Sequence, residues 1–181
     1  MSGPKVASVS LARGHGFSKR AVLEVRLVAG LGVEGDAHFG SLTQHRYYKR
    51  FDPQRPNLRQ VHLIEERVYQ DLQGLGFAVE MGDLGENITT SGTDLTSLPE
   101  GTLIQIGEDA QIELTGLREP CVLIDRFMPD LRKAVSVTGE DGRPFVRGAV
   151  MARVVRSGVI SAGDMITSNL PRGLNRSLQN V

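Results

Sequence analysis

The chain has 181 residues, of which 40% are hydrophobic and 23% charged, a mix typical of one globular domain. Its 21 basic residues balance 21 acidic ones, so the formal net charge is zero, which argues against a general binder of nucleic acid or anionic membranes. A single cysteine excludes an internal disulfide. Because the sequence also lacks a signal peptide and any run of about 18 apolar residues, we expect a cytoplasmic protein that crosses no membrane.

The N-terminal third alternates between apolar and polar residues, which predicts strands over residues 6–11 and 21–28. Residues 31–36 indicate a turn. The stretch 36–58 contains two histidines, two tyrosines and two prolines, and it is long for a plain connection. We therefore expect a functional loop there, in the form of a partly helical excursion or a surface flap.

The middle of the chain predicts a strand over 59–64, a helix over 65–74, a strand over 84–90 and a hairpin of 102–106 with 111–115. Pro120 is suited to open a short helix, and 131–135 fits either helix or strand. Strands follow at 146–155, 158–160 and 163–166. Such closely spaced short strands predict a mainly β (α+β) fold in the form of a closed or partly closed barrel. We expect one domain over 1–170, followed by a flexible tail at 171–181.

The only thiol, Cys121, follows a predicted strand in the segment TGLREPC. A thiolate near an arginine is a nucleophile and a ligand for soft metals. A lone cysteine is also often a small buried hydrophobic residue. The residues by themselves leave both interpretations open.

Two further segments contain candidate binding residues. Asp36 and His38 are two positions apart, so in an extended loop their side chains would point the same way and could orient a hydrogen bond or bind a cation. With His45 they form a set that is too loosely spaced for a firm zinc prediction. Asn87 follows Gly85 in the run GENIT and would either contact a ligand or stabilise its own turn.

Several common catalytic motifs are absent from the sequence. It contains no GxxxxGK[ST] phosphate loop, no GxGxxG after a strand and no GxSxG nucleophile turn. It also lacks a CxxC pair, which excludes zinc ribbons and thioredoxin-like redox sites.

The chain resembles a MOSC domain from about residue 6 to residue 166. This family includes the C-terminal domain of molybdenum-cofactor sulfurases and many stand-alone bacterial proteins. The likeness rests on these segments in this order: GVEGDAHFG, RQVHLIEE, GDLGENITTSGTDLTSLPEGTLIQIG, ELTGLREPC and RGAVMARVVRSGVISAGDMI. The resemblance implies a β-barrel with a few peripheral helices, similar to the barrel domain of pyruvate kinase.

By resemblance, Cys121 is the expected catalytic residue and metal ligand, which would carry sulfur as a persulfide or ligate the molybdenum of a bound molybdopterin. Arg59 and Arg118 lie beside matching motifs and would hold the phosphate of the pterin. The sequence has GDAHFG where many members have a run like GDRHHGG, so one arginine and one histidine of that pattern are missing.

By the same resemblance, Asp36, His38 and Asn87 would line the cofactor pocket. Pyridoxal phosphate is not expected, because the aminotransferase-like domain of full cofactor sulfurases is absent and no lysine sits in a Schiff-base motif.

The resemblance predicts either sulfur transfer in the maturation of metal–sulfur cofactors or molybdenum-dependent reduction of N-hydroxylated compounds. The first needs a sulfur-donor protein and the second an electron-donor protein, together with the pterin cofactor or a small-molecule substrate. Two alternatives remain: a non-catalytic module that binds or carries a small anion, and a divalent-metal enzyme that uses Asp36, His38 and His45.

Overall fold

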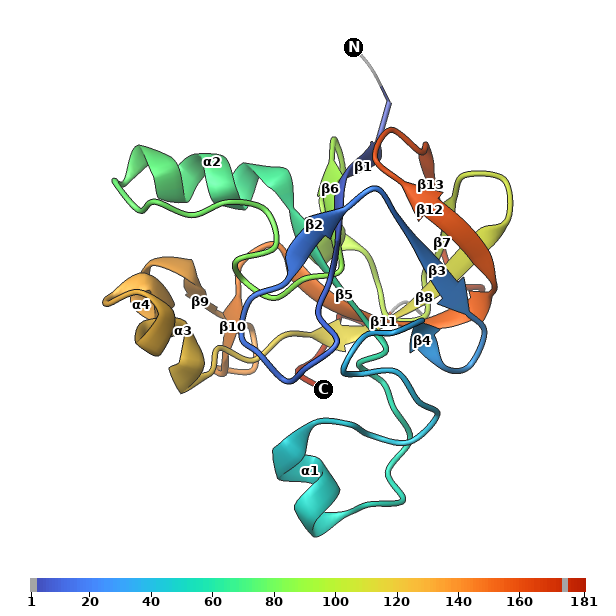
Figure 1. Ribbon diagram of the computed structural model, residues 1–181, viewed down its shortest axis with the longest axis horizontal. Coiled ribbons are helices and arrows are strands. Elements are labelled where there is room, and N and C mark those ends of the chain that lie inside the picture. The colour runs from blue at the N-terminus through green and yellow to red at the C-terminus, as the bar shows by residue number, and fades with distance from the viewer. Residues whose placement is uncertain (1–2, 174–175) are drawn as a thin grey trace.

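A curled eight-stranded sheet forms most of the molecule in the computed structural model, which describes residues 3–173 and 176–181, with the side chain of Arg46 excepted (Figure 1). Its strands lie in the order β13-β7-β8-β11-β5-β6-β1-β2. Their bounds are β1 Lys5–Leu11, β2 Arg20–Val22, β5 Val61–Glu65, β6 Ile88–Ser91, β7 Leu103–Ile106, β8 Ala110–Leu117, β11 Ala149–Arg156 and β13 Ile166–Asn169.

The two ends of this sheet meet where β1 begins. The amide of Val6 donates to the carbonyl of Asp164 at 2.9 Å, and the amide of Ile166 donates to the carbonyl of Pro4 at the same distance. Register shifts in the β1–β6 and β11–β8 pairs bend the strands and make this curling geometrically feasible. A three-stranded sheet, β12-β3-β4, completes the wall, with bounds β12 Gly158–Ser161, β3 Glu24–Val28 and β4 Gly32–Val33.

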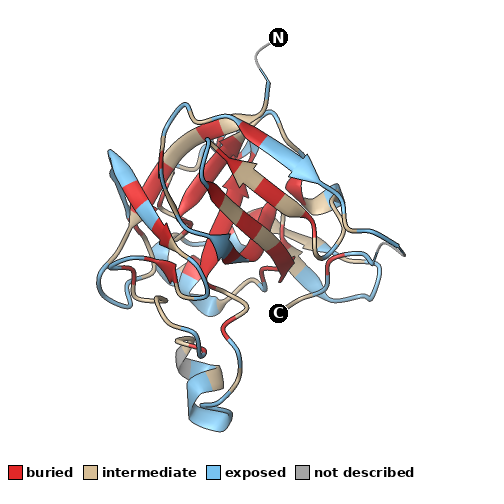
Figure 2. Ribbon diagram, turned by 90° about the vertical axis from the view of Figure 1, so that its right-hand side faces the viewer, coloured by how far each residue is buried: buried red, intermediate tan, exposed pale blue. Residues whose placement is uncertain are grey.

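The interior of the barrel is filled by aliphatic side chains such as Leu27, Leu63, Ile104, Ile112 and Val150, all inaccessible to solvent. Figure 2 shows that buried residues are concentrated on the strands of the barrel. The alternation of inward and outward residues follows from the two-residue period of a strand. The interior of the barrel is therefore filled by side chains, which leaves the outside of the barrel for ligand binding.

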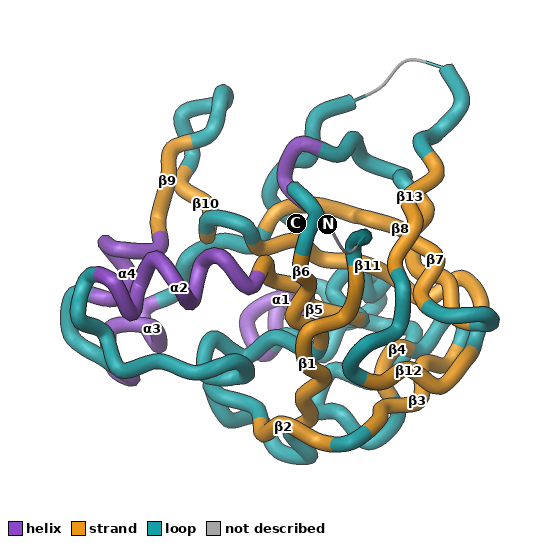
Figure 3. Tube along the Cα trace, turned by 90° about the horizontal axis from the view of Figure 1, so that it is seen from above, coloured by secondary structure: helices purple, strands orange, loops and turns teal. Residues whose placement is uncertain are grey.

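A helical layer covers one side of the barrel (Figures 1 and 3). Its members are α2 Glu66–Gly74, α3 Val122–Phe127 and α4 Leu131–Val135, with the small sheet of β9 Ser136–Thr138 and β10 Pro144–Val146 beside them. They form a second apolar cluster with Ile64 of β5 and Ala149 of β11. Strand β5 is consequently buried on both faces, with Leu63 in the barrel and Ile64 under the helices.

The irregular stretch 36–58 protrudes from the barrel and carries the short helix α1, Arg46–Phe51 (Figure 1). Figure 2 shows that most of this helix is exposed. The side chains of Tyr47 and Phe51 are 63% and 67% exposed. The prediction of a partly helical excursion is confirmed.

The structure corrects two of the predicted strands and decides one open assignment. The run 21–28 is split into β2 and β3, because the chain bends at Leu23, whose side chain is 92% exposed. The strand predicted from residue 84 begins only at Ile88, because Gly82 and Gly85 have positive φ and form turns. Residues 131–135 are helical, and a one-turn 3₁₀ helix, η1 Leu95–Ser97, interrupts the preceding connection.

Part of the segment expected to be a flexible tail lies against the barrel. Leu178 is only 5% exposed, and the amide of Leu117 donates to the carbonyl of Gln179 at 2.8 Å. Gly116 makes this contact sterically feasible, because a Cβ at that position would collide with the Gln179 carbonyl and Val181.

Candidate functional site

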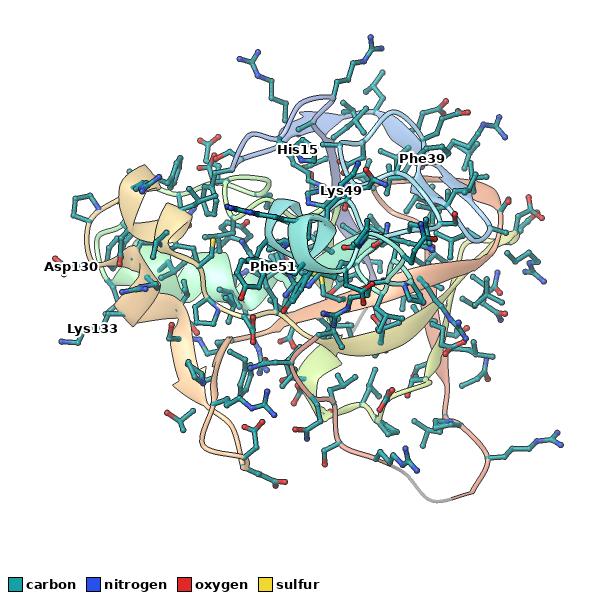
Figure 4. All side chains as sticks on the ribbon, turned by 90° about the horizontal axis from the view of Figure 1, so that it is seen from below. His15, Phe39, Lys49, Phe51, Asp130 and Lys133 are labelled. Atoms are coloured by element: carbon teal, nitrogen blue, oxygen red, sulfur yellow. The ribbon has the colours of Figure 1, made fainter. Side chains whose placement is uncertain are left out.

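A cavity of about 380 Å³ lies outside the barrel, beneath the helical layer and the α1 excursion. Its walls come from the loop 15–19, the excursion between 38 and 59, strands β5 and β11, the turn 85–87 and the segment 118–123. This volume falls in the range of roughly 300–1,000 Å³ typical of small-molecule and cofactor sites. In the view from below, His15 and α1 with its Lys49 and Phe51 lie near the centre, and Asp130 and Lys133 lie to one side with α4 (Figure 4).

Five of the six predicted site residues line this cavity, although they are far apart in sequence. They are His38, Arg59, Asn87, Arg118 and Cys121. Asp36 is placed differently from the prediction: its side chain is fully shielded from solvent and lies behind the wall instead of lining it.

Asp36 connects three segments through its two carboxylate oxygens. Oδ2 accepts from Nζ of Lys19 at 2.7 Å and from Nδ2 of Asn87 at 3.0 Å. Oδ1 accepts from the amide of His38 at 3.0 Å and lies 3.3 Å from Nδ1 of its ring. Burial alone would raise the pKa of Asp36, but the His38 hydrogen bonds and the Lys19 charge outweigh it and lower the pKa. The carboxylate therefore stays ionised and orients the imidazole of His38.

The buried carboxylate of Glu86 holds the GENIT run in its conformation. Oε1 of Glu86 accepts from the hydroxyl of Tyr69 at 2.7 Å, the amide of Gly82 at 2.6 Å and the hydroxyl of Thr89 at 2.9 Å. This arrangement fixes the neighbouring Asn87, whose Oδ1 accepts from the amide of His62 at 3.2 Å. The motif is therefore a scaffold that joins β1, β5 and the Asp36 network.

Arg118 and Cys121 lie together at the end of β8. Nη1 of Arg118 donates to the carbonyl of Leu84 at 2.6 Å, and its guanidinium lies close enough to Cys121 for a favourable electrostatic interaction. Burial lowers the pKa of Arg118, and the contact with Cys121 opposes that effect. An arginine remains charged even so, because its ordinary pKa exceeds 12. Cys121 itself is partly exposed and has no disulfide partner.

Arg59 occupies a different wall of the same cavity. Its Nε donates to the carbonyl oxygen of Val181 at 2.6 Å, and its guanidinium lies 5.6 Å from the ring of Tyr48. Its Nη2 is buried without a hydrogen-bond partner. Within the described part of the chain, neither Arg59 nor Arg118 forms an ion pair with an Asp or Glu side chain. These two arginines share the cavity lining with one carboxylate, that of Glu119, so positive charge exceeds negative charge among the described lining residues.

All four histidines of the chain line the cavity: His15, His38, His45 and His62. Burial, reinforced by the charges of Arg59 and nearby histidines, lowers the pKa of His45 to about 4. Burial, reinforced by Arg118, lowers the pKa of His62 well below its ordinary value. Burial is the larger cause of both shifts, and the nearby positive charges add to it, so this cavity disfavours a further positive charge on either ring.

We expect the protein to lose stability as the pH falls from about 6.5 to 4. In that window the unfolded chain protonates His45 while the folded chain does not, so protons favour unfolding. His45→Gln should reduce this loss by on the order of 1 kcal/mol, a value discounted for the partial exposure of the ring. Urea unfolding at several pH values measures the slope, and an unchanged slope in the variant would contradict the assignment.

Sequence reasoning missed Lys19, His15 and Phe17 as parts of the site. They belong to the loop between β1 and β2, which shows no motif, and they reach the cavity only because β1 pairs with β6. His62 lies in the matched run RQVHLIEE, but a histidine in a buried strand has no pattern that distinguishes a ligand from a core residue.

The described residues, 3–173 and 176–181, contain no group of three or more His, Cys, Asp or Glu that could hold a metal ion. The alternative of a divalent-metal enzyme built on Asp36, His38 and His45 therefore has no ligand cluster in this part of the chain. Nor does any helix found there have the length and apolar character needed to cross a membrane.

The curled sheet, the helices on one side and the cavity outside the barrel define a MOSC-type β-barrel. The model of the MOSC domain matches residues 35–167, so the chain belongs to the MOSC domain family. The resemblance stated from the sequence is thereby confirmed, as is the mainly β fold.

Among curated proteins, YuaD of Bacillus subtilis (strain 168) is 30% identical over an alignment that covers 75% of this chain and 74% of YuaD. Its name provisionally assigns it to metal-sulfur cluster biosynthesis. The crystal structure of YuaD from Bacillus subtilis is similar to this fold, with a TM-score of 0.71 at 24% identity over 93% of this chain and 97% of that one.

YiiM from Geobacillus stearothermophilus is also similar, with a TM-score of 0.64 at 19% identity over 94% of this chain and 77% of YiiM. YiiM from Escherichia coli has a TM-score of 0.61 at 18% identity over 98% of this chain and 74% of that YiiM. At these identities the structural likeness establishes the fold alone.

Proposed function

We propose that the chain binds a molybdenum–pterin cofactor in the described cavity, with Cys121 as the residue that ligates the metal or carries sulfur. The single observation that supports this most is the proximity of the only thiol to a buried arginine in the wall of a cavity that three cationic side chains line. The name of YuaD, which refers to metal-sulfur cluster biosynthesis, agrees with a role in sulfur chemistry.

The residues present fit such a group. A pterin cofactor is anionic at its phosphate, and Arg59 has a buried Nη2 with no partner in the protein. Molybdenum takes soft sulfur ligands, and Cys121 supplies the only thiol of the chain. The buried donor would otherwise cost roughly 1–3 kcal/mol, which a bound anion would relieve.

We assign two roles to the residues of the cavity: some would bind the cofactor, and others position the groups that do. Arg59 and Arg118 would bind the anionic end of the cofactor, and Arg118 would also hold the Cys121 thiolate in place. Asp36 orients His38, which gives the cavity a ring nitrogen able to donate or accept a proton. The cofactor, when bound, supplies a metal centre for sulfur or oxygen-atom chemistry.

The finer choice between sulfur transfer and reduction of an N-hydroxylated compound depends on the partner. We propose that a sulfur-donor or electron-donor protein delivers its group through the open side of the cavity. Val122 and Leu123, which are 56% and 42% exposed at the cavity rim, are placed to contact it.

Elemental analysis after expression in a host that makes the molybdenum cofactor tests the proposal. Wild-type protein should retain molybdenum through gel filtration, and Cys121→Ala should lose it. Arg59→Met should lower the molybdenum content by about tenfold, because a residue that orients the bound group is removed.

Arg153→Met is the matched control. Arg153 pairs with Glu113 on the surface, with Nη2 3.0 Å from Oε2, so this variant should keep its molybdenum. If wild type holds no molybdenum and intact mass shows no persulfide on Cys121, the proposal fails and a module for small anions becomes the better description.

A further inference from the structure

The segment 177–181, which we call the strap, is anchored to the end of β8. The amide of Leu117 donates to the carbonyl of Gln179 at 2.8 Å, and the strap runs parallel to β8 with Asn180 opposite Leu117. Leu178 belongs to the apolar cluster of the barrel and is only 5% exposed. Backbone hydrogen bonds and one buried apolar side chain therefore hold the strap in place.

The strap also contacts Arg59, which lines the cavity. The carbonyl oxygen of Val181 accepts from Nε of Arg59 at 2.6 Å, and the guanidinium lies 5.6 Å from the ring of Tyr48. The residue before it, Leu58, has its carbonyl bonded by the hydroxyl of Thr115 in β8 at 2.5 Å. Both the backbone next to Arg59 and its side chain are therefore tied to the end of β8, the side chain through the strap.

The strap lies behind the cavity wall and leaves the cavity free. Arg59 lines the cavity, whereas none of the described residues 176–181 does. Residues 177–180 line a separate groove, together with the β9–β10 hairpin. The Val181 carbonyl therefore fixes Nε of Arg59 without taking up space that a ligand in the cavity would use.

We propose that the strap is a positioning element of the candidate site, in which the Val181 carbonyl holds Arg59 ready for an anionic ligand. An arginine has a long side chain that loses rotamer freedom when it binds, and holding its Nε beforehand reduces the entropy lost at that step. The inference rests on the proposed function only in taking this cavity as the ligand site. Because coupling between two equilibria is reciprocal, an anion bound at Arg59 in turn stabilises the docked strap.

Gly116→Ala displaces the strap without changing Arg59. A Cβ at Gly116 would collide with the Gln179 carbonyl and with the Val181 side chain. Gly158→Ala is the matched control, because its Cβ also meets the backbone of a neighbouring strand, at Ala110. Ala110 is the first residue of β8, whereas the strap contacts the last one, and neither glycine of the pair lines the cavity.

A second pair of variants acts from the strap itself. Leu178→Ala removes the apolar side chain that anchors the strap, so it should loosen the strap even if Gly116→Ala failed to fold. Gln179→Ala is its control, since that side chain is exposed and the backbone carbonyl is kept.

The test is an NMR titration of the cofactor-free full chain with inorganic phosphate at pH 7. Gly116→Ala and Leu178→Ala should weaken phosphate binding by about three- to tenfold, because Arg59 must then be ordered during binding. Gly158→Ala and Gln179→Ala should stay within about twofold of wild type. In an Arg59→Met background, Gly116→Ala should change the affinity by less than about twofold, because the strap then has no arginine to position.

Two hydrogen-exchange measurements tell positioning from a merely structural role. The Nε–H signal of Arg59 should exchange slowly with solvent in wild type and in both controls, and faster in the two strap variants. The amide of Leu117 reports docking of the strap, because Gln179 accepts its hydrogen bond. Saturating phosphate should slow its exchange in wild type by about the same factor by which the strap strengthens phosphate binding.

The inference is overturned if wild type does not bind phosphate, or if the strap variants bind it as tightly as wild type or more tightly. It is also overturned if Gly158→Ala weakens binding as much as Gly116→Ala does, or if the loss persists in the Arg59→Met background. A protein that shows this coupling but never carries molybdenum would refute the cofactor proposal and leave this inference standing. A protein that carries molybdenum but whose phosphate affinity does not depend on the strap would refute this inference alone.

Discussion

Asp36→Ala is expected to lower the free energy of unfolding by about 3–5 kcal/mol, because it leaves the Lys19 ammonium buried without its counter-charge. Nζ of Lys19 lies 2.7 Å from Oδ2 of Asp36, and the two side chains are 5% and 0% exposed. The variant also removes the Asp36 acceptor of the Asn87 side-chain amide and of the His38 backbone amide. Urea unfolding monitored by circular dichroism measures the loss.

Glu34→Ala is the matched control. Glu34 pairs with Arg26 at 3.7 Å, but both side chains are more than half exposed, at 61% and 59%. Solvent screens such a pair, so its loss should change stability by less than about 1 kcal/mol. Equal effects of the two variants would show that the buried pair has no special structural role.

The effect of Asp36 should also depend on pH. Since its pKa is lowered in the folded protein, its contribution is complete above the ordinary carboxyl pKa of about 3.9 and disappears as the pH falls toward the lowered value. The stability difference between wild type and Asp36→Ala should therefore be constant from pH 5 to 7 and should shrink below about pH 4. A difference that grows in acid would contradict the lowered pKa.

Gly85→Ala is expected to destabilise the protein by about 3–5 kcal/mol and to distort the cavity. The residue has φ +84°, and a Cβ there would collide with the carbonyl oxygen of Phe17. The substitution therefore combines an unfavourable backbone conformation with a clash between two cavity walls. Chemical denaturation measures the loss of stability, and the molybdenum content measures the damage to the site.

Gly76→Ala separates the two contributions. Gly76 has a similar φ of +90°, but nothing lies within 4 Å of a Cβ built there. It should cost only about 1–2 kcal/mol, the price of a left-handed conformation for an alanine. If Gly85→Ala cost no more than this, the close approach of Phe17 would be unimportant.

Local patterns predicted much of the fold. The hairpin of β7 and β8 and the helix α2 were visible because their apolar residues recur at the period of a strand and of a helix. The split of 21–28 at Leu23 could not be predicted from the sequence. Strand β2 pairs with β1 while β3 pairs with β12, and a local pattern of residues does not show which strands pair.

The candidate site was predictable only in part. Cys121, Arg118 and Asn87 stand in motifs that are recognisable in sequence, and the structure brings them to one cavity. Asp36 was expected in the same pocket but lies behind its wall, because Lys19 and Asn87 hold its carboxylate in the interior. Lys19 could not be predicted, since its partner is 17 residues away and the loop between them has no pattern.

The sequence by itself determined the family, the strand-rich class and the segments that contain the thiol and the arginines, because these follow from the order of residues along the chain. Only the tertiary structure decided which residues share a cavity and which polar atoms are left without a partner there. Asp36 shows the physical reason. Whether its carboxylate lies in the pocket or behind the wall depends on Lys19 and Asn87, which are distant in sequence and which the fold brings to hydrogen-bonding distance of it. Burial and hydrogen-bond satisfaction are properties of the folded arrangement, and no local sequence pattern encodes them.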